Sequence, residues 1–407
     1  MTDSHDFRAH SHRRRADGRR LPAATLAVVR LVIVDPRSDS RPYDHGLGAA
    51  LAARGHDVEL AACRFHHGDL PPAPGVRVRE CFYRLADRLP SRFRRLGRGA
   101  EHLFDLAVLI LRFVIDRPDA IHVQWLPLGA VDRFAWRIAG RLVRRPIVYT
   151  AHNAIPKLGV GSAGQVVADC APFDAVVVHS AAGAASLRDL GVPDRRIVRV
   201  PHGALDGYAD VRAIAPQRIP AGAPVAAFAG LIRPYKGLGD LLAVWPTVRR
   251  AVPDAVLAVS GRPLGADADA AQAMALDRAG AGVVADIRYI PAGEFAGLLR
   301  RADLVVLPYR SIDQSGVLFS AIALGRPLVV TDVGGLGEVI VATGAGIVVA
   351  PGDGDALADA IIRLLCDGEL REAMGAAGLA AATGAYSWAV AAERSEALYG
   401  RLRSSRR

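Results

Sequence analysis

The chain has 407 residues, of which 51% are apolar and 23% charged, and this balance excludes a disordered protein because so many apolar groups can offset the entropy of folding. A chain of this length usually divides into two or three domains. The formal net charge of +10 lies mostly near the two ends and in one internal segment, and no RNA-binding or helix-turn-helix motif accompanies it, so nucleic acid is not expected as a partner.

Residues 1–28 predict a disordered basic tail, because residues 1–20 contain six Arg and only three Asp. The apolar stretch that follows imitates a short signal peptide, but Arg30 interrupts it, so a first strand is expected there instead. No window of about 18 residues is apolar enough to span a bilayer. The cysteines are spaced too widely for a disulfide framework or a zinc site and favour a reducing, cytoplasmic location: Cys63, Cys81, Cys170 and Cys366.

Residues 29–203 predict a first α/β domain, since continuous β-branched runs alternate there with helical stretches, as in a parallel sheet covered on both faces. Residues 204–223 are interpreted as a linker, residues 224–385 as a second domain of the same kind, and residues 386–407 as a helix that crosses back to the first domain and ends in a basic tail. The expected strands are RLVIVD, DVELAAC, VRVREC, AIHVQW, PIVYTAH, AVVVHS and IVRVPHG, then PVAAFAG, AVLAVSG, DIRYI, LVVLPY, PLVVTD and GIVVA.

A basic loop, Arg84–Arg98, lies between the third and fourth expected strands and carries six Arg against one acid, Asp87. An amphipathic helix, HLFDLAVLILRFVI, follows it. The loop is either a solvated surface turn or a patch that contacts anionic lipid headgroups or a phosphorylated acceptor. Both interpretations stay open at this point.

Ligands of open parallel sheets bind beyond the carboxyl ends of the strands. Three histidines follow expected strands, and each has a structural alternative: His152 could cap a turn, His179 precedes a helix-capping serine, and His202 could pack between the domains. The stretch FAGLIRPYKGLGDLL places Gly230 after a strand and then Arg233 and Lys236 at the start of a helix. Cations beside helix N-termini favour a phosphate, so this segment predicts an anion site.

A second anion site is predicted where the strand ending at Tyr309 is followed by Ser315 and Gly316, at the start of the next helix. Asp313 is the nearest acid and is either a turn cap or a contact to a sugar hydroxyl. After the next strand, Glu338 begins a helix, where it either offsets the helix dipole or contacts the nucleotide.

The second half resembles a family 4 glycosyltransferase of the GT-B fold, through GLIRPYKGLGDLL, RRADLVVLPYRSIDQSGVLFSAIALGRPLVVTDVGGLGEVI and the late helix after Ser387. The first half is similar mainly in architecture, with weaker echoes in TAHN, VVVHS and VPHG. The resemblance implies two Rossmann-like domains facing a cleft, with the nucleotide-diphosphate sugar bound by the second domain, the acceptor bound by the first, and retention at the anomeric carbon. It also implies that Arg233 and Lys236 hold the diphosphate and that His152 faces the donor sugar and acceptor. No cofactor or metal is expected, because these cations and the helix N-termini neutralise the leaving group.

The chain departs from the family pattern of two glutamates eight positions apart. Ser320 occupies the second place, where it can still bond a ribose hydroxyl, and Ile312 occupies the first. Asp313, one position away, either substitutes for the first glutamate or leaves donor contacts to the backbone around Ser315. Asp35 and Asp39, after the first strand, are candidates for acceptor contact or a general base.

The expected function is transfer of a hexosyl group from a nucleotide-diphosphate sugar to a hydroxyl of a lipid-linked or glycan acceptor, in the cytoplasm or at the inner face of the cell membrane. The missing glutamate at Ser320 leaves open a nucleotide-sugar-binding protein that has lost turnover. A sugar-nucleotide epimerase of the same fold is the other alternative.

Overall fold

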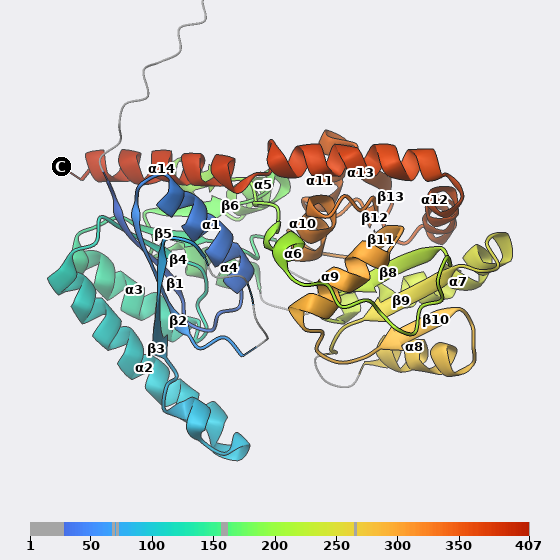
Figure 1. Ribbon diagram of the computed structural model, residues 1–407. Coiled ribbons are helices and arrows are strands. Elements are labelled where there is room, and N and C mark those ends of the chain that lie inside the picture. The colour runs from blue at the N-terminus through green and yellow to red at the C-terminus, as the bar shows by residue number, and fades with distance from the viewer. Residues whose placement is uncertain (1–27, 67–69, 71–72, 156–161, 264–266, 407) are drawn as a thin grey trace, which may run out of the picture.

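The computed structural model describes residues 28–66, 70, 73–155, 162–263 and 267–406. The predicted basic tail lies outside the described residues, apart from Val28. Two parallel sheets lie side by side in Figure 1, each covered by helices on both faces. This confirms the predicted pair of Rossmann-like domains.

The first sheet has the strand order β3-β2-β1-β4-β5-β6-β7 and the second the order β10-β9-β8-β11-β12-β13, with every pair of neighbours parallel. In both, the order reverses beside a central strand, which is where doubly wound sheets open a crevice for ligands. The strands are β1 (Arg30–Asp35), β2 (Asp57–Cys63), β3 (Val76–Phe82), β4 (Ala120–Val123), β5 (Ile147–Thr150), β6 (Ala175–Val178), β7 (Ile197–Arg199), β8 (Val225–Ala229), β9 (Val256–Ser260), β10 (Val283–Asp286), β11 (Leu304–Leu307), β12 (Leu328–Thr331) and β13 (Gly346–Val349).

Most helices begin at residues that suit a helix start. Ser180, Asp353 and Ser387, for example, accept a hydrogen bond from the backbone of the first turn. The helices are α1 (Arg41–Ala53), η1 (Ala86–Arg88), α2 (Ser91–Asp116), α3 (Ala130–Val143), α4 (Ala163–Cys170), α5 (Ala181–Asp189), η2 (Asp194–Arg196), α6 (Gly207–Asp210), η3 (Pro234–Lys236), α7 (Leu238–Ala251), α8 (Ala268–Arg278), α9 (Ala292–Arg301), α10 (Gly316–Ala323), α11 (Leu336–Thr343), α12 (Gly354–Cys366), α13 (Gly368–Thr383) and α14 (Trp388–Ser404).

Two local predictions are wrong. The strand expected at DIRYI is β10, which lies earlier, because Val283–Asp286 pairs in register with β9 and the chain leaves the sheet after Asp286. The segment Arg84–Arg98 is not a loop throughout, since α2 begins at Ser91, directly after Pro90. The last four of its six arginines are therefore carried by the same helix as the apolar run that follows: Arg92, Arg94, Arg95 and Arg98.

The C-terminal helix α14 runs across the top of the first domain in Figure 1 and packs on α1. Glu396 on α14 accepts a hydrogen bond from Arg54 Nε at 2.6 Å, and Tyr399 is 2.7 Å from Nδ1 of the buried His122. The indole of Trp388 lies directly against the backbone of Gly46 and Gly203, where a Cβ would fall 2.1 and 2.2 Å from the ring. Glycine is therefore required at both positions for α14 to pack against the first domain through Trp388.

Within the described residues, none of the helices combines the length and the apolar character needed to cross a membrane.

Replacing Trp388 with Ala is expected to lower the free energy of unfolding by about 3–5 kcal/mol, because the indole is 8% exposed and its removal leaves a cavity between α1 and α14. Urea unfolding followed by fluorescence measures the change. Val341→Ala is the control, since that side chain is 77% exposed and its loss should alter stability by less than about 0.5 kcal/mol. Equal stability of the Trp388 variant and the wild type would contradict the docking of α14.

Candidate active site

A cleft of about 640 Å³ lies between the domains, at the carboxyl ends of both sets of strands. Its walls come from the loops that follow β1, β4, β5, β6 and β7 on one side and β8, β9, β10 and β11 on the other. Among the lining residues that the structure describes there are four cations and a single acid, so the cleft favours an anionic ligand. The cations are Arg37, Arg233, Lys236 and Arg262, and the acid is Asp39.

Lys236 ends the short helix η3 and is buried in the cleft wall, with 8% of its surface exposed. Its Nζ lies over the ring of Tyr309, 5.2 Å from the centre, and no hydrogen bond or carboxylate from the described part of the chain holds it. Burial lowers the pKa of this amine from 10.5 to about 8, and the charge of Arg233 acts in the same direction. A buried ammonium without a counter-ion is strongly stabilised when an anion binds beside it.

The strand-end glycines leave room for that anion. Gly230 has a φ of 100°, and a Cβ there would lie 3.4 Å from Lys236 Nζ and 3.2 Å from Val317 Cγ2 in the first turn of α10. The lysine amine and the start of α10 therefore face the same small space. A Cβ at Gly261 would fall 1.8 Å from the carbonyl oxygen of Gly230, so only glycine lets β8 and β9 end so close together.

The start of α10 completes this corner of the cleft. Ser315 is the N-cap residue, but its hydroxyl makes no capping bond, and both it and Gly316 line the cleft. Ser320 also lines the cleft and donates to the carbonyl of Gly316 at 2.9 Å. The predicted set of Gly230, Lys236 and the α10 start is thus brought together, and Arg233 lies on the same wall, near the ring of Tyr235.

The three predicted histidines meet on the opposite wall, where Tyr43 of α1 contacts all of them with ring centres 5.0 to 5.2 Å apart. His152 stacks on Trp125 at 4.9 Å and bonds Gln124 at 2.9 Å. Burial lowers the pKa of His179 to about 4 and that of His202 to about 3, so both rings are neutral near pH 7.

His202 also joins the two domains. Its ring stacks on Phe319 of α10 with centres 4.2 Å apart and planes 5° apart. Its Nδ1 lies 2.7 Å from the carbonyl of Gly203, so this nitrogen carries the proton in the neutral ring. The packing of His202 between the domains, one of its two predicted roles, is therefore observed, and because the residue also lines the cleft, its contact with a ligand stays a prediction.

Sequence reasoning missed four lining or supporting residues. Gln124 and Trp125 follow β4 just as the histidines follow β5, β6 and β7, so the same strand-end rule would have found them. Arg262 follows β9 in the same way. Arg37 sits in the loop after β1 and pairs with Asp39 at 3.3 Å. These four residues belong to no recognisable motif, and the one feature they share in the sequence is their position just after a strand.

Asp313 and Glu338 do not line the cleft, although contact with the donor was one of the two roles predicted for each. Asp313 is buried between the domains, where its carboxylate accepts from Ser180 Oγ at 2.7 Å and from the backbone N–H of Ala154 at 3.1 Å. Glu338 accepts from Arg199 at 2.9 Å and from the N–H of Ala181 at 2.7 Å. Both acids bond donors of the first domain, so they hold the two domains together.

The acids after β1 also differ in their surroundings. Asp35 is fully buried and accepts from the backbone N–H of Ser40 at 2.9 Å, which shapes the loop rather than the cleft surface. Asp39 lines the cleft, and burial raises its pKa, opposed by the charge of Arg37. Within the described ranges no group of three or more His, Cys, Asp or Glu side chains is arranged to hold a metal ion.

Comparison with known proteins gives consistent results for both halves. The family described as "Glycosyltransferase Family 4" matches residues 45–204, and that described as "Glycosyl transferases group 1" matches residues 212–380. A D-inositol 3-phosphate glycosyltransferase of Nocardia farcinica is 30% identical over 84% of this chain and 80% of its own length. A phosphatidyl-myo-inositol mannosyltransferase of Mycobacterium leprae is 28% identical over 88% and 92%.

Solved structures resemble the fold over nearly the whole chain. Sucrose-phosphate synthase from Thermosynechococcus elongatus superposes with a TM-score of 0.70 at 20% identity, covering 92% of this chain and 99% of that one. The Anabaena protein HepE in complex with UDP-glucose gives a TM-score of 0.67 at 16% identity, covering 91% and 100%. These likenesses confirm the GT-B arrangement of the two domains.

Replacing Lys236 with Met is expected to stabilise the ligand-free protein at pH 7, because the buried charge costs the folded state on the order of 3 kcal/mol. The amine has a lower pKa in the fold (about 8) than in the unfolded chain (10.5), so the unfolded chain binds more protons between these values and wild-type stability gains from rising pH there. The difference in unfolding free energy between the variant and the wild type should therefore shrink as the pH rises towards 10.5. Urea unfolding at several pH values measures it, and equal stabilities at pH 7 would show that the amine is not desolvated.

Proposed function

Because the chain belongs to the family 4 glycosyltransferases, we propose that it moves a hexosyl group from a nucleotide-diphosphate sugar to a hydroxyl of a lipid-linked or glycan acceptor, retaining the anomeric configuration. The observation that carries the proposal is the buried amine of Lys236, which faces the start of α10 across Gly230 and lacks a carboxylate partner among the described residues. A diphosphate supplies the missing counter-charge.

The donor is expected to lie along the second domain. Its diphosphate takes the space beside Lys236, Arg233 and the N–H groups around Gly316, where point charges and a helix N-terminus act on the same anion. Ser320, one turn further along α10, then offers its hydroxyl to the nucleotide ribose. The sugar points towards the first domain, at the wall that holds His152.

The reaction breaks the bond between the anomeric carbon and the diphosphate oxygen and forms a bond from that carbon to the acceptor oxygen on the same face. The acceptor hydroxyl's proton goes to the leaving diphosphate, so no protein carboxylate has to act as nucleophile. This route suits the cleft, because Asp39 is the one carboxylate in the described part of its lining. The cations stabilise the negative charge that grows on the leaving group.

The cytoplasm is the proposed compartment, at the inner face of the membrane where a lipid-linked acceptor is used. The four cysteines support this placement, because all are free thiols, as expected in a reducing compartment.

Incubation with UDP-, GDP- and ADP-sugars, followed by mass spectrometry, tests the proposed reaction. Transfer to an added acceptor extract supports it. Stabilisation of the protein by a donor without any turnover would instead identify a nucleotide-sugar-binding protein, which the serine at position 320 makes the specific alternative. Isomerisation of the donor without an acceptor would identify an epimerase.

Lys236→Ala is expected to cost about 2–4 kcal/mol of transition-state stabilisation, or roughly 30- to 900-fold in kcat/KM, because a preorganised charge beside the leaving group is lost. The rate of donor turnover measures the effect. Arg250→Ala is the matched control, since this cation near the far end of α7 is exposed and, within the described ranges, bonds only Thr247 of its own helix. Unchanged turnover in the Lys236 variant would remove the lysine from the diphosphate site.

Turnover is also expected to continue in excess EDTA and to gain little from added Mg²⁺ or Mn²⁺, because the proposed site neutralises the diphosphate with side-chain cations and helix N–H groups. Initial rates with and without the chelator provide the measurement. A large loss of rate in EDTA, restored by a divalent ion, would replace this part of the proposal with a metal-assisted one.

A further inference from the structure

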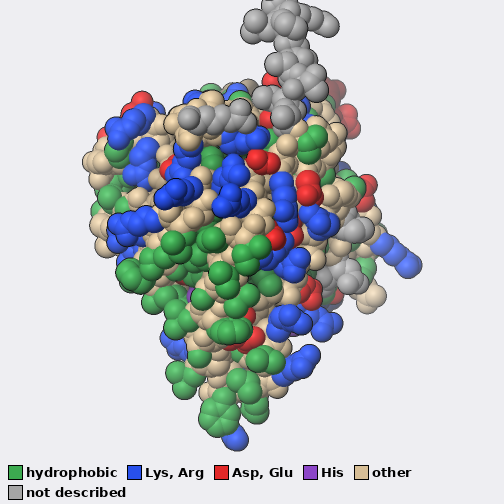
Figure 2. Space-filling model, turned by 90° about the vertical axis from the view of Figure 1, so that its left-hand side faces the viewer, with side chains coloured by type: hydrophobic (Ala, Val, Ile, Leu, Met, Phe, Trp, Pro, Cys, Tyr) green, Lys and Arg blue, Asp and Glu red, His purple; other side chains and the backbone are tan. Residues whose placement is uncertain are grey.

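An exposed apolar face covers the outer side of the first domain, on helices α2 and α3. Figure 2 shows hydrophobic side chains gathered there in one area, with basic side chains above it and along its edges. Leu103, Phe104, Leu111 and Ile115 of α2 are 51 to 71% exposed, and Phe134 of α3 is 65% exposed. A buried hydrogen bond of 2.6 Å between His102 and Asp132 joins the two helices. These five apolar residues, with Phe93 at 50% exposure, define the outer apolar face.

The fold itself does not account for this face. Helix α2 already packs on the sheet through a separate apolar stripe, which includes Leu106, Leu109 and Phe113, all at most 3% exposed. A helix with one apolar stripe normally turns its charged side to the solvent. Here the solvent side of the same helix is apolar as well.

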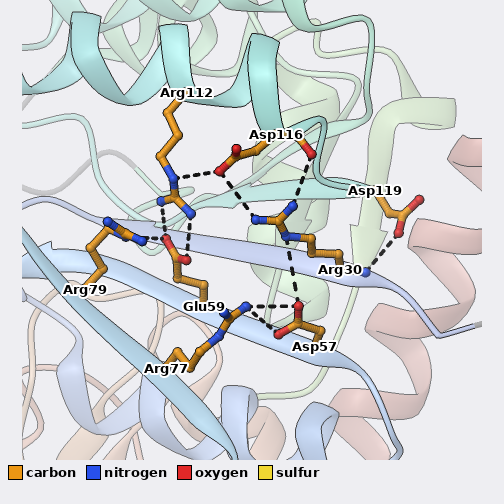
Figure 3. A network of polar contacts seen from close by, with 8 residues as sticks. All are labelled: Arg30, Asp57, Glu59, Arg77, Arg79, Arg112, Asp116 and Asp119. Carbon is orange, nitrogen blue, oxygen red and sulfur yellow. Dashed lines mark hydrogen bonds and ion pairs between the residues drawn. The ribbon is translucent and has the colours of Figure 1, made fainter.

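The charged residues in the second half of α2 are drawn towards the protein. Figure 3 shows Arg112 and Asp116 pointing at the strands, where Arg112 bonds Glu59 of β2 at 2.8 Å and Asp116 pairs with Arg30 of β1 at 3.4 Å. Asp105 likewise accepts from the backbone N–H of Tyr83 at 2.9 Å. The outward side between Leu103 and Ile115 is consequently left without charge.

Unpaired arginines border the outer apolar face. Among the described residues, no carboxylate forms an ion pair with the arginines in the first turns of α2 or with those in the second half of α3 and directly after it, whereas Arg98, Arg112 and Arg133 are all paired. The unpaired ones are Arg92, Arg94, Arg95, Arg137, Arg141 and Arg144.

We propose that the outer apolar face docks this protein on an anionic lipid bilayer. Its aromatic and aliphatic side chains enter the boundary between headgroups and acyl chains, and the bordering arginines bind lipid phosphates. Contiguous apolar patches exposed on the surface of a folded domain commonly mark an interaction site. The alternative occupant, a second copy of the chain, fits less well, because a twofold contact would bring the same unpaired arginines of both copies against each other.

The docking goes beyond the proposed transfer reaction and does not depend on it. It uses none of the residues that line the cleft. A failure of one proposal therefore leaves the other standing, and donor turnover in solution and vesicle binding are separate readouts.

Flotation of the full-length protein with phosphatidylcholine vesicles, with and without phosphatidylglycerol, tests the docking. The wild type is expected to float with the anionic vesicles and to be released by high salt only in part, since the apolar contact is not screened. The double variant Phe104→Gln, Leu111→Gln should lose at least about tenfold in partition coefficient, because two large side chains no longer leave water. Val341→Gln, an equally exposed apolar position in the second domain, should float like the wild type.

Replacing Arg137 and Arg141 with Gln should lower binding to anionic vesicles several-fold. The proposal is overturned if the wild type stays unbound, or if the Phe104, Leu111 double variant floats as well as the wild type. A concentration-dependent dimer in sedimentation velocity, abolished by the same double variant and accompanied by no vesicle binding, would assign the face to a second copy instead. Circular dichroism of each variant confirms that it is folded.

Discussion

Lys236 is held in the cleft by the ring of Tyr309 on one side and by the glycine turn after β8 on the other, and no described carboxylate balances its charge. The arrangement is costly in the empty protein, since a desolvated ammonium prefers either a counter-ion or the loss of its proton. Salt bridges satisfy many of this chain's arginines. Lys236 differs from the unpaired surface arginines because it is buried in the cleft wall, and under the proposed function its charge serves the diphosphate, for which the glycines at the strand ends leave space.

The junction between the domains explains where the acidic residues of the second domain go. Asp313 and Glu338 each accept hydrogen bonds from the first domain, from Ser180 and Ala154 in one case and from Arg199 and Ala181 in the other. These bonds fix the loop after β11 and the start of α11, and so place α10 opposite the histidine wall. The cleft keeps its positive character because these two carboxylates bond donors of the first domain and do not line the cleft.

Much of the fold could be predicted, because a buried parallel strand is an unbroken apolar run, and RLVIVD and DVELAAC coincide with β1 and β2. The strand predicted at DIRYI was wrong, since the sequence does not show whether this run or the preceding VVAD pairs with β9. Gly230, Lys236 and Ser315 were predictable as strand-end and helix-start residues. The position of Asp313 was not, because its partners are more than a hundred residues away and only the packing of two domains brings them together.

Helix α2 shows why charge counting along the sequence gives an incomplete account of a surface. Its arginines and acids suggest a helix whose polar side faces water, yet the structure uses Arg112 and Asp116 to tie the helix to β1 and β2. Because those charged side chains point towards the sheet, the apolar side chains between them point towards the solvent. Whether a residue such as Phe104 is buried or exposed thus depends on the ion pairs of its neighbours, and these pairs form only when α2 packs on the sheet that contains β1 and β2.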